Sequence, residues 1–408
     1  IELALTNNIS LRQQRSDYAT QRLQYQQSKY NLLPSLSGSV GQSFAFGRAT
    51  GADNVTVSQN IANTSFGLNA NLLLFDGLAM KFKIDEARAN MEAYEYNTKK
   101  SELDIRMNIT TMFLQVLLNK ELLAVADTQR LTTQSNVEKV EMLVKQGRTA
   151  IGELYTLQSQ LAKEELQKTQ AENDLRLSLL DLAQAMDVEY SENFDINAPA
   201  WLTEDDELLP SNDYVYAKAL QNRPELKAAQ SQLQASQSAL KTAKAAYSPS
   251  LTAGASVSTG YYHIFGANSD DFGTQLYDNL SSGIGLNLSI PIFDKMQTPN
   301  SINRYKIAIE RQELQIELVR QTLKKQIDQS YYNAIAAQTQ QYSAQKAEQS
   351  AQEAYRYAEE KYEAGRSTAY EFNDAKNNYT NAKSQYLQAK YNYLFKLKVL
   401  KYYMAEGI

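Results

Sequence analysis

The chain contains an internal duplication, and this feature constrains its fold more than any other. Motifs of the first half recur 218 positions later in the same order: Phe75-Asp76 returns as Phe293-Asp294, and Gly147-Arg148-Thr149 returns as Gly365-Arg366-Ser367. Because the interval between the two motifs is the same in both copies, the segment between them has accepted no insertion. Loops tolerate insertions, whereas closely packed helices do not. We therefore expect two long arms packed along their length, in a pseudo-symmetric structure built half by each copy.

The composition indicates long elements and few turns, since the 408 residues include only 16 Gly and 7 Pro. The net charge of −5 argues against nucleic acid, whose binding calls for a basic stripe. We find no run of about 18 apolar residues that could span a bilayer as a helix. The absence of Cys fits a periplasmic or surface protein. A helical pattern is already present at Ile1, which indicates a leader upstream and leaves open whether the start carries a lipid.

Four segments alternate apolar residues with small or polar ones, and this period of two indicates β-strands. In one of them Phe66, Leu68 and Leu72 alternate with Gly67 and Asn69. Each segment would have one apolar face and one small, polar face. The expected strands cover residues 35–46, 65–75, 250–260 and 282–293. The stretch at 47–64 is rich in Gly, Asn and Thr and is predicted to be a loop.

A long helix is expected after each Phe-Asp motif, with about 70 residues and therefore about 105 Å of length. The seam positions that pack in coiled-coil fashion are Ile105, Ile109, Met112 and Val116 in the first long helix and Leu154, Leu157 and Leu161 after its turn. The expected boundaries are a helix at 77–146, a tip turn at 147–150 and a return helix to 187, then a second helix to 364, a turn at 365–368 and a return to 405. The chain would thus consist of a first repeat (1–187), a connector (188–211) and a second repeat (212–408).

Strands of this kind fit either a soluble sheet or a transmembrane barrel with lipid outside and water inside. A soluble sheet needs a second layer, and four strands joined to very long helices have none. The strands are long enough for a bilayer, where no sheet edge can stay unpaired. Single-chain bacterial barrels need at least about eight strands, so these four must share a barrel with other subunits. This reasoning requires an oligomer and leaves a dimer open. Two strands per copy also place all the helices on one side of the membrane.

The duplicated order of helix, strand, loop, strand, Phe-Asp and long helix resembles the TolC-like outer-membrane efflux factor family. The Gly-Arg-Thr and Gly-Arg-Ser turns and the closing segment from Ala389 to Leu394 resemble it too, so the likeness covers essentially the whole chain. It implies an α+β membrane protein: a homotrimer with a 12-stranded transmembrane β-barrel, four strands from each protomer, continuing into a 12-helix periplasmic α-barrel. It also implies a small mixed equatorial domain, to which residues 188–211 would contribute.

The resemblance further implies a passive exit duct in the outer membrane of a Gram-negative bacterium, with its helices in the periplasm. Such a duct is gated at the helical tip and opened by a periplasmic adaptor coupled to an inner-membrane pump of the RND, ABC or MFS type. The alternative from another class is a coiled-coil scaffold or surface interaction protein that forms no channel. The sequence leaves the cargo and the pump class open.

Roles for residues at the tip follow from the resemblance. Glu371 and Asp374 match the acidic positions that ring the periplasmic entrance, where three like charges would favour cations; the competing interpretation is that both are solvated surface charges. Tyr362 and Glu153 match a pair that holds the tip closed. The family's basic partner would fall at Ser367, one residue beyond Arg366, and one step turns a helical side chain by about 100°, so the part of Arg366 in this latch stays open.

Other residues are assigned surface or structural roles. The tip turns resemble the docking surface for adaptor hairpins, through Gly147, Arg148, Thr149, Gly365, Arg366 and Ser367. The aromatic residues expected at the membrane rims are Phe75, Phe293, Tyr261 and Tyr262. Asp76 and Asp294 are expected to cap the helices that follow them. With a single His, no Cys and no phosphate-binding loop, the sequence offers no catalytic constellation, metal site or cofactor site.

Overall fold

The computed structural model describes residues 1–50, 56–58, 60–198 and 209–405. The chain forms two compact units, and each contains segments of both sequence repeats. One unit, here called the helical unit, consists of residues 1–16, 95–227 and 317–408. The other, here called the sheet unit, consists of residues 17–94 and 228–316. Residues 199–208 of the expected connector lie outside the described part of the chain.

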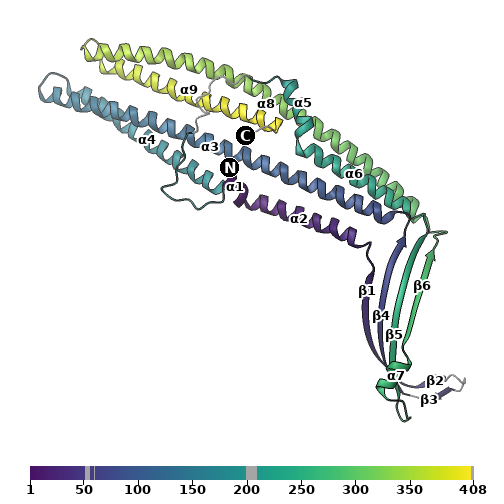
Figure 1. Ribbon diagram of the computed structural model, residues 1–408. Coiled ribbons are helices and arrows are strands. Elements are labelled where there is room, and N and C mark those ends of the chain that lie inside the picture. Colours follow the sequence, from purple (N-terminus) through teal and green to yellow (C-terminus); the bar gives the residue numbers. More distant parts are fainter. Residues whose placement is uncertain (51–55, 59, 199–208, 406–408) are drawn as a thin grey trace. The chain divides into compact units, whose positions relative to one another are not determined.

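The sheet unit contains one antiparallel four-stranded sheet in the order β1-β4-β5-β6 (Figure 1). Its strands are β1 (Ser35–Ala45), β4 (Ile61–Phe75), β5 (Ser250–Ile264) and β6 (Ser281–Ser289). The central pair, β4 and β5, joins the first repeat to the second in a register that runs from Ile61 opposite Ile264 to Phe75 opposite Leu251. The smaller elements are β2 (Arg48–Thr50), β3 (Thr56–Ser58) and α7 (Phe272–Asp278). The duplication therefore supplies one hairpin from each copy.

Three strand ends differ from the sequence prediction, and one of them is the end of β5, which continues to Ile264 rather than 260. β4 begins at Ile61 rather than 65, because the predicted loop residues 61–64 pair with both β1 and β5. Pairing on both sides overrides the weak strand preference of Asn63 and Thr64. β6 ends at Ser289 rather than 293, and Pro291 explains the difference because it has no N–H to donate to a neighbouring strand.

The sheet exposes large apolar side chains and leaves its two outer strands paired on one side only. Leu36 and Val40 of β1 are 75% and 73% exposed, and Ile284 and Leu286 of β6 are 89% and 69% exposed. Among the described residues, β1 pairs only with β4 and β6 only with β5. A sheet with open edges and an exposed apolar face is unstable alone in water, since both features invite association.

The two long helices match in length and in the way they start. α3 (Ala79–Lys145) and α8 (Gln297–Glu363) each contain 67 residues. A carboxylate oxygen of Asp76 accepts a 2.8 Å hydrogen bond from the Met80 N–H, and Asp294 accepts one of 2.7 Å from the Thr298 N–H. Both aspartates therefore cap the long helices as expected.

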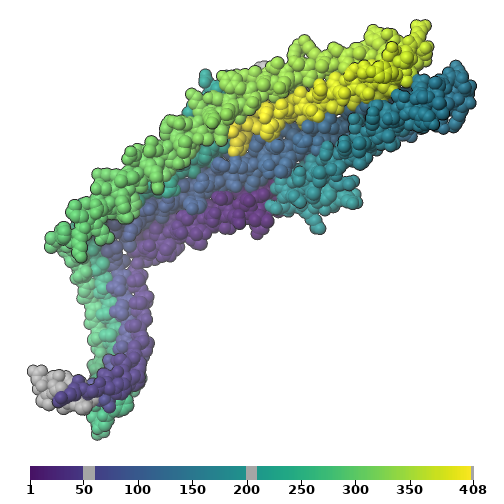
Figure 2. All heavy atoms as spheres, turned by 180° about the vertical axis from the view of Figure 1, so that it is seen from behind, coloured from purple at the N-terminus to yellow at the C-terminus, as the bar shows by residue number. Residues whose placement is uncertain are grey.

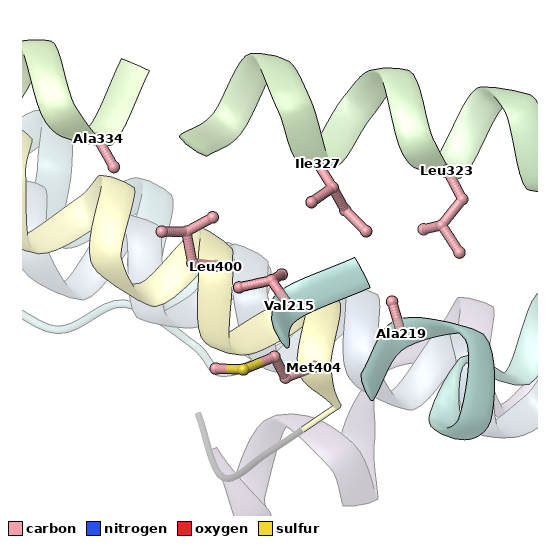
Figure 3. Close-up of a cluster of buried hydrophobic side chains, with 7 residues drawn as sticks. All are labelled: Val215, Ala219, Leu323, Ile327, Ala334, Leu400 and Met404. Atoms are coloured by element: carbon pink, nitrogen blue, oxygen red, sulfur yellow. The ribbon is translucent and has the colours of Figure 1, made fainter. Parts of the chain in front are cut away.

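The helical unit contains most of the two helical hairpins, α3 with α4 (Ile151–Ala185) and α8 with α9 (Ala369–Met404); the first parts of α3 and α8 belong to the sheet unit. Both views place α9, drawn in yellow, between α8 and α3 (Figures 1 and 2). The other helices among the described residues are α1 (Glu2–Asn7), α2 (Ile9–Tyr30), α5 (Asn212–Asn222) and α6 (Pro224–Ala245). The buried cluster that joins α5, α8 and α9 is shown in Figure 3 and consists of Val215, Ala219, Leu323, Ile327, Ala334, Leu400 and Met404.

The predicted seam positions lie in the cores of the first hairpin. Ile109 and Val116 of α3 are buried with Leu179 of α4 and Ala4 of α1. Nearer the tip, Leu157 is 1% exposed and packs against Val137 and Val140, with Leu154 and Leu161 beside it. The coiled-coil interpretation of this hairpin is therefore confirmed.

One long helix is apolar enough over part of its length to resemble a membrane span. By length and composition α3 could cross a membrane, because an 18-residue stretch of it has a mean hydropathy of 1.4. No such segment was expected from the sequence. A core helix of a soluble bundle passes the same test, and 39% of that stretch is buried within the structure. Helix packing therefore accounts for the buried part of this stretch.

A buried arginine ties α9 to the corner between α5 and α6. Arg223 is 2% exposed, and its Nε lies 2.8 Å from Glu225. Its other nitrogens donate to the Tyr402 carbonyl at 3.0 Å and to the Tyr402 hydroxyl at 3.1 Å, and that hydroxyl also contacts Asp104 of α3. Burial raises the pKa of Tyr402 to about 12, while the Arg223 charge opposes the shift.

Candidate functional site

The two tip turns have the same backbone geometry. Gly147 and Gly365 have φ angles of 71° and 69°. In each turn the N–H of the following arginine donates to a carbonyl five residues earlier: Arg148 to Leu143 at 2.9 Å and Arg366 to Lys361 at 2.8 Å. This is the Schellman arrangement, which satisfies the last carbonyls of a helix and favours glycine because of its positive φ. Both arginines are exposed, so the turns present two similar surfaces.

The starts of the two return helices differ, and the difference affects two glutamates at equivalent positions. Thr368 and Glu371 form a capping box: the Glu371 N–H donates to the threonine hydroxyl at 3.2 Å, and the Thr368 N–H donates to the glutamate at 3.3 Å. In the first repeat Ala150 occupies the cap position and offers no hydroxyl. Glu371 therefore has a capping role that its counterpart Glu153 lacks.

Tyr362 and Glu153 lie in one groove near the tip turns. Burial raises the pKa of Tyr362, and the charge of Glu153 and hydrogen bonding to it raise it further. The tyrosine ring stacks on Phe372, with 4.9 Å between centroids and 18° between planes, and Phe372 is 2% exposed. The groove has a volume of about 780 Å³, and its lining includes Val140, Leu143, Thr149 and Ser367. The structure thus brings Tyr362 and Glu153 together, whereas Arg366 is exposed outside this lining.

The other acidic position, Asp374, is exposed on α9 one turn beyond Glu371. Its carboxylate accepts a hydrogen bond from the Asn378 amide at 3.2 Å. It borders a second groove of about 500 Å³ between α4 and α9, which Tyr155 and Lys163 also line. Because residues three apart share a helix face, Glu371 and Asp374 lie on the same side of α9.

The rim aromatics occupy opposite ends of the sheet. Phe75 and Phe293 lie where strands lead into the long helices and are 45% and 78% exposed. Tyr261 and Tyr262 lie at the far end of β5. The Tyr261 ring packs edge-on against Phe272 of α7, with 5.2 Å between centroids. Aromatic side chains therefore flank the apolar band of the sheet at both ends.

The described ranges contain no group of three or more His, Asp or Glu residues that could hold a metal ion. The single histidine, His263, is 2.8 Å from the Ser269 hydroxyl through its Nδ1.

Sequence reasoning missed a buried ionic cluster behind the tip. Lys376 of α9 and Glu164 of α4 are 3% and 1% exposed and form an ion pair of 2.7 Å. Burial lowers the pKa of Lys376, and Glu164 opposes this shift. No local sequence motif predicts such a pair, because the burial of its two side chains depends on how three helices pack together.

Comparisons with known proteins agree with this geometry. A family model described as outer membrane efflux protein matches residues 1–187 and 215–405. No curated protein matches the sequence. The structure is similar to CusC, a protein that forms a transmembrane channel (TM-score 0.82, 18% identity, covering 100% of this chain and 91% of CusC). It is also similar to the Campylobacter jejuni CmeC outer membrane channel (TM-score 0.77, 18% identity, covering 98% of this chain and 84% of CmeC). A third similar structure is the Neisseria gonorrhoeae MtrE outer membrane channel in its open state, with a TM-score of 0.80 and 19% identity, covering 100% of this chain and 88% of MtrE.

These similarities confirm the fold class expected from the sequence. The chain is an internally duplicated α+β protein in which a four-stranded barrel segment leads into long helices.

Proposed function

The chain belongs to the outer membrane efflux protein family, which places it in the outer membrane with its helical part in the periplasm, and we propose that it is the passive exit duct of a tripartite efflux or secretion system. In this proposal an inner-membrane pump supplies the energy and a periplasmic adaptor opens the duct. The chain itself provides the wall and the gate.

The observation that carries the proposal is the incomplete sheet. Its two outer strands have free edges among the described residues, and apolar side chains such as Val40 and Ile284 are more than 70% exposed. In a bilayer, exposed apolar side chains are favourable, but open sheet edges are not tolerated. Pairing β1 of one copy with β6 of the next satisfies both requirements.

Three copies give a barrel of twelve strands, which exceeds the minimum of about eight. Two copies would just reach that minimum. We propose the trimer because the family resemblance implies it, and the mass of the assembly distinguishes the two.

The gate is proposed at the tip. Tyr362 and Glu153 would hold α8 to the start of α4, and their shared groove and mutual interaction support this role. Asp374, together with Glu371, would form an acidic ring when three copies meet, favouring cations. Both carboxylates would contribute to the field at the entrance, Glu371 held by its capping contact and Asp374 by the Asn378 amide.

The tip turns are the proposed docking surface for the adaptor. Their matched geometry gives each protomer two similar contact points, so three protomers would offer six. The residues concerned are Gly147, Arg148, Thr149, Gly365, Arg366 and Ser367.

The direct test is single-channel recording. The protein, purified in mild detergent, is added to a planar lipid bilayer, and the unheated protein is run on a gel beside a heated sample. A duct gives discrete conductance steps and a heat-sensitive oligomer band. A coiled-coil scaffold gives neither, and that result would exclude the proposal.

A further inference from the structure

The buried pair between Lys376 and Glu164 connects the second repeat to both helices of the first hairpin. The Lys376 ammonium lies 2.7 Å from an oxygen of Glu164 on α4 and also donates to the hydroxyl of Thr133 on α3. Thr133 is fully buried. One side chain of α9 is therefore held by two helices whose contributing residues are more than two hundred positions away in sequence.

Two glutamine amides extend the cluster. The side-chain amides of Gln129 on α3 and Gln160 on α4 donate to the same Glu164 oxygen, at 3.1 and 2.8 Å. Both also reach the side-chain oxygen of Asn377, next to Lys376 on α9, at 3.2 and 3.3 Å. The cluster thus makes contacts in more than one direction, so it restricts both rotation and sliding of α9.

A buried ion pair contributes little net stability compared with well-packed apolar residues, but breaking it leaves a charge without a partner. Rotating α9 by one residue, or sliding it by one turn, would separate the Lys376 ammonium from Glu164 and leave that 1%-exposed carboxylate without its ion-pair partner. Arrangements of that kind are therefore strongly disfavoured. The cluster selects one register of α9 against α3 and α4.

The cluster lies behind the tip. Lys376 is seven residues into α9, about 10 Å of helix from its start, and Glu164 is thirteen residues into α4, about 20 Å from its start. Tyr362, Glu153 and Phe372 all lie on the tip side. When the latch residues separate, the cluster is therefore the next contact along α9 that resists further separation of the helices.

We propose that Lys376 and Glu164 are positioning residues that form a clamp, which fixes α9 to the first hairpin and confines the opening movement to the tip. The inference rests on the proposed gated duct, because a clamp has a role only where a tip moves. On the tip side of the clamp, α9 and the first hairpin bend or separate when the latch opens. Behind the clamp, the distance between α9 and the first hairpin stays the same.

The test uses pairs of spin labels, and the natural absence of Cys gives a clean background. The tip pair is Tyr155→Cys with Tyr370→Cys, two exposed positions lining one groove. The rear pair is Gln167→Cys with Gln388→Cys, two exposed positions lining another groove behind the clamp. Labelled protomers are diluted with unlabelled ones, so that distances within one chain are measured.

The clamp is removed by Lys376→Met together with Glu164→Gln, which deletes both charges and leaves none unpaired. In the parent protein, we expect one narrow peak in the distribution of spin-label distances at the rear pair. Without the clamp, we expect this peak to broaden. Lys145→Met is the matched control, because it breaks the exposed pair between Lys145 and Glu141 at 2.8 Å and should leave the rear peak narrow. A rear peak that stays narrow without the clamp overturns the inference.

A second comparison separates this inference from the proposed function. Opening the latch by Tyr362→Phe with Glu153→Gln should broaden the tip pair and leave the rear pair narrow. If the tip pair does not respond, the proposed latch is wrong, and the rear pair without the clamp still decides the inference. If the purified protein conducts no ions, the duct is wrong, and the label distances remain measurable.

Discussion

Gly147 and Gly365, 218 positions apart, end the two 67-residue helices in the same left-handed conformation, with φ angles of 71° and 69°. Apart from the glycine itself and its two chain neighbours, no residue has a heavy atom within 4 Å of a Cβ added at either position. Backbone conformation, and not crowding, therefore selects glycine at both turns. Both hairpin tips of the duplicated chain therefore use a glycine in the left-handed conformation.

Replacing Gly365 by Ala should destabilise the second tip turn by about 1–2 kcal/mol, the cost of a left-handed residue that carries a Cβ. Amide hydrogen exchange at Ala364 and Arg366 measures the loss. Gly152→Ala is the control, because that glycine also has free space but no positive φ, and it should be neutral or stabilising. Equal exchange rates in Gly365→Ala and the parent protein would contradict this explanation of the turn.

Tyr362→Phe should raise the resting conductance of the channel. The substitution keeps the stacking on Phe372 and removes the hydroxyl that interacts with Glu153. Glu153→Gln should act in the same direction, and the double variant should add little to either one, because both remove one interaction. Tyr357→Phe is the control, since that exposed ring retains its contact with Arg356. Parent-like conductance in Tyr362→Phe would exclude the latch.

Asp374→Asn combined with Glu371→Gln should weaken block of the channel by multivalent cations added on the periplasmic side. Both amides preserve hydrogen-bond acceptors, so the cap at Thr368 and the contact with Asn378 are kept while two charges per protomer disappear. Dose–response curves of the block in planar bilayers measure the effect. Glu165→Gln, at an exposed position of α4, serves as the control. If the double variant shows the same cation block as the parent protein, Glu371 and Asp374 are ordinary surface charges and form no acidic ring.

Stability should fall above pH 10 partly because of Tyr402. Its pKa is raised from 10.0 to about 12 in the folded state, so between these values the unfolded chain loses the proton and the folded chain keeps it. The contribution, on the order of 2 kcal/mol, is present below pH 10 and lost as the pH rises to about 12. Denaturant unfolding from pH 8 to 12 measures the slope.

Tyr402→Phe should make that slope shallower, whereas the exposed Tyr30→Phe should leave it unchanged. Identical slopes for Tyr402→Phe and the parent protein would show that the site with Arg223 and Asp104 does not control this loss of stability.

The duplication made much of the fold predictable. Gly147, Asp76 and Leu157 occupy positions whose role follows from local rules: a positive φ, a helix cap and a coiled-coil seam. Such roles depend on neighbours within a few residues. The second copy repeats the glycine and the aspartate as Gly365 and Asp294, whereas Ala375 stands at the position of Leu157. Pro291 could also have been recognised as a strand end, since proline cannot continue a sheet ladder.

The contacts between distant segments could not be predicted. Lys376 and Arg223 look like ordinary surface charges in the sequence, and only the meeting of several helices buries them. The capping box was within reach, because Thr368 and Glu371 have its three-residue spacing. The cap residue distinguishes the two glutamates, because Glu153 follows Ala150 at the same spacing and alanine has no hydroxyl.

Closure of the sheet by sister chains is the central claim, and the native mass of the protein in mild detergent tests it directly. We predict one species of three chains, three times 46.0 kDa plus bound detergent, with its strands intact by circular dichroism. A single species of one chain with the same strand content would contradict this claim, because the free edges of β1 and β6 would then need no partner.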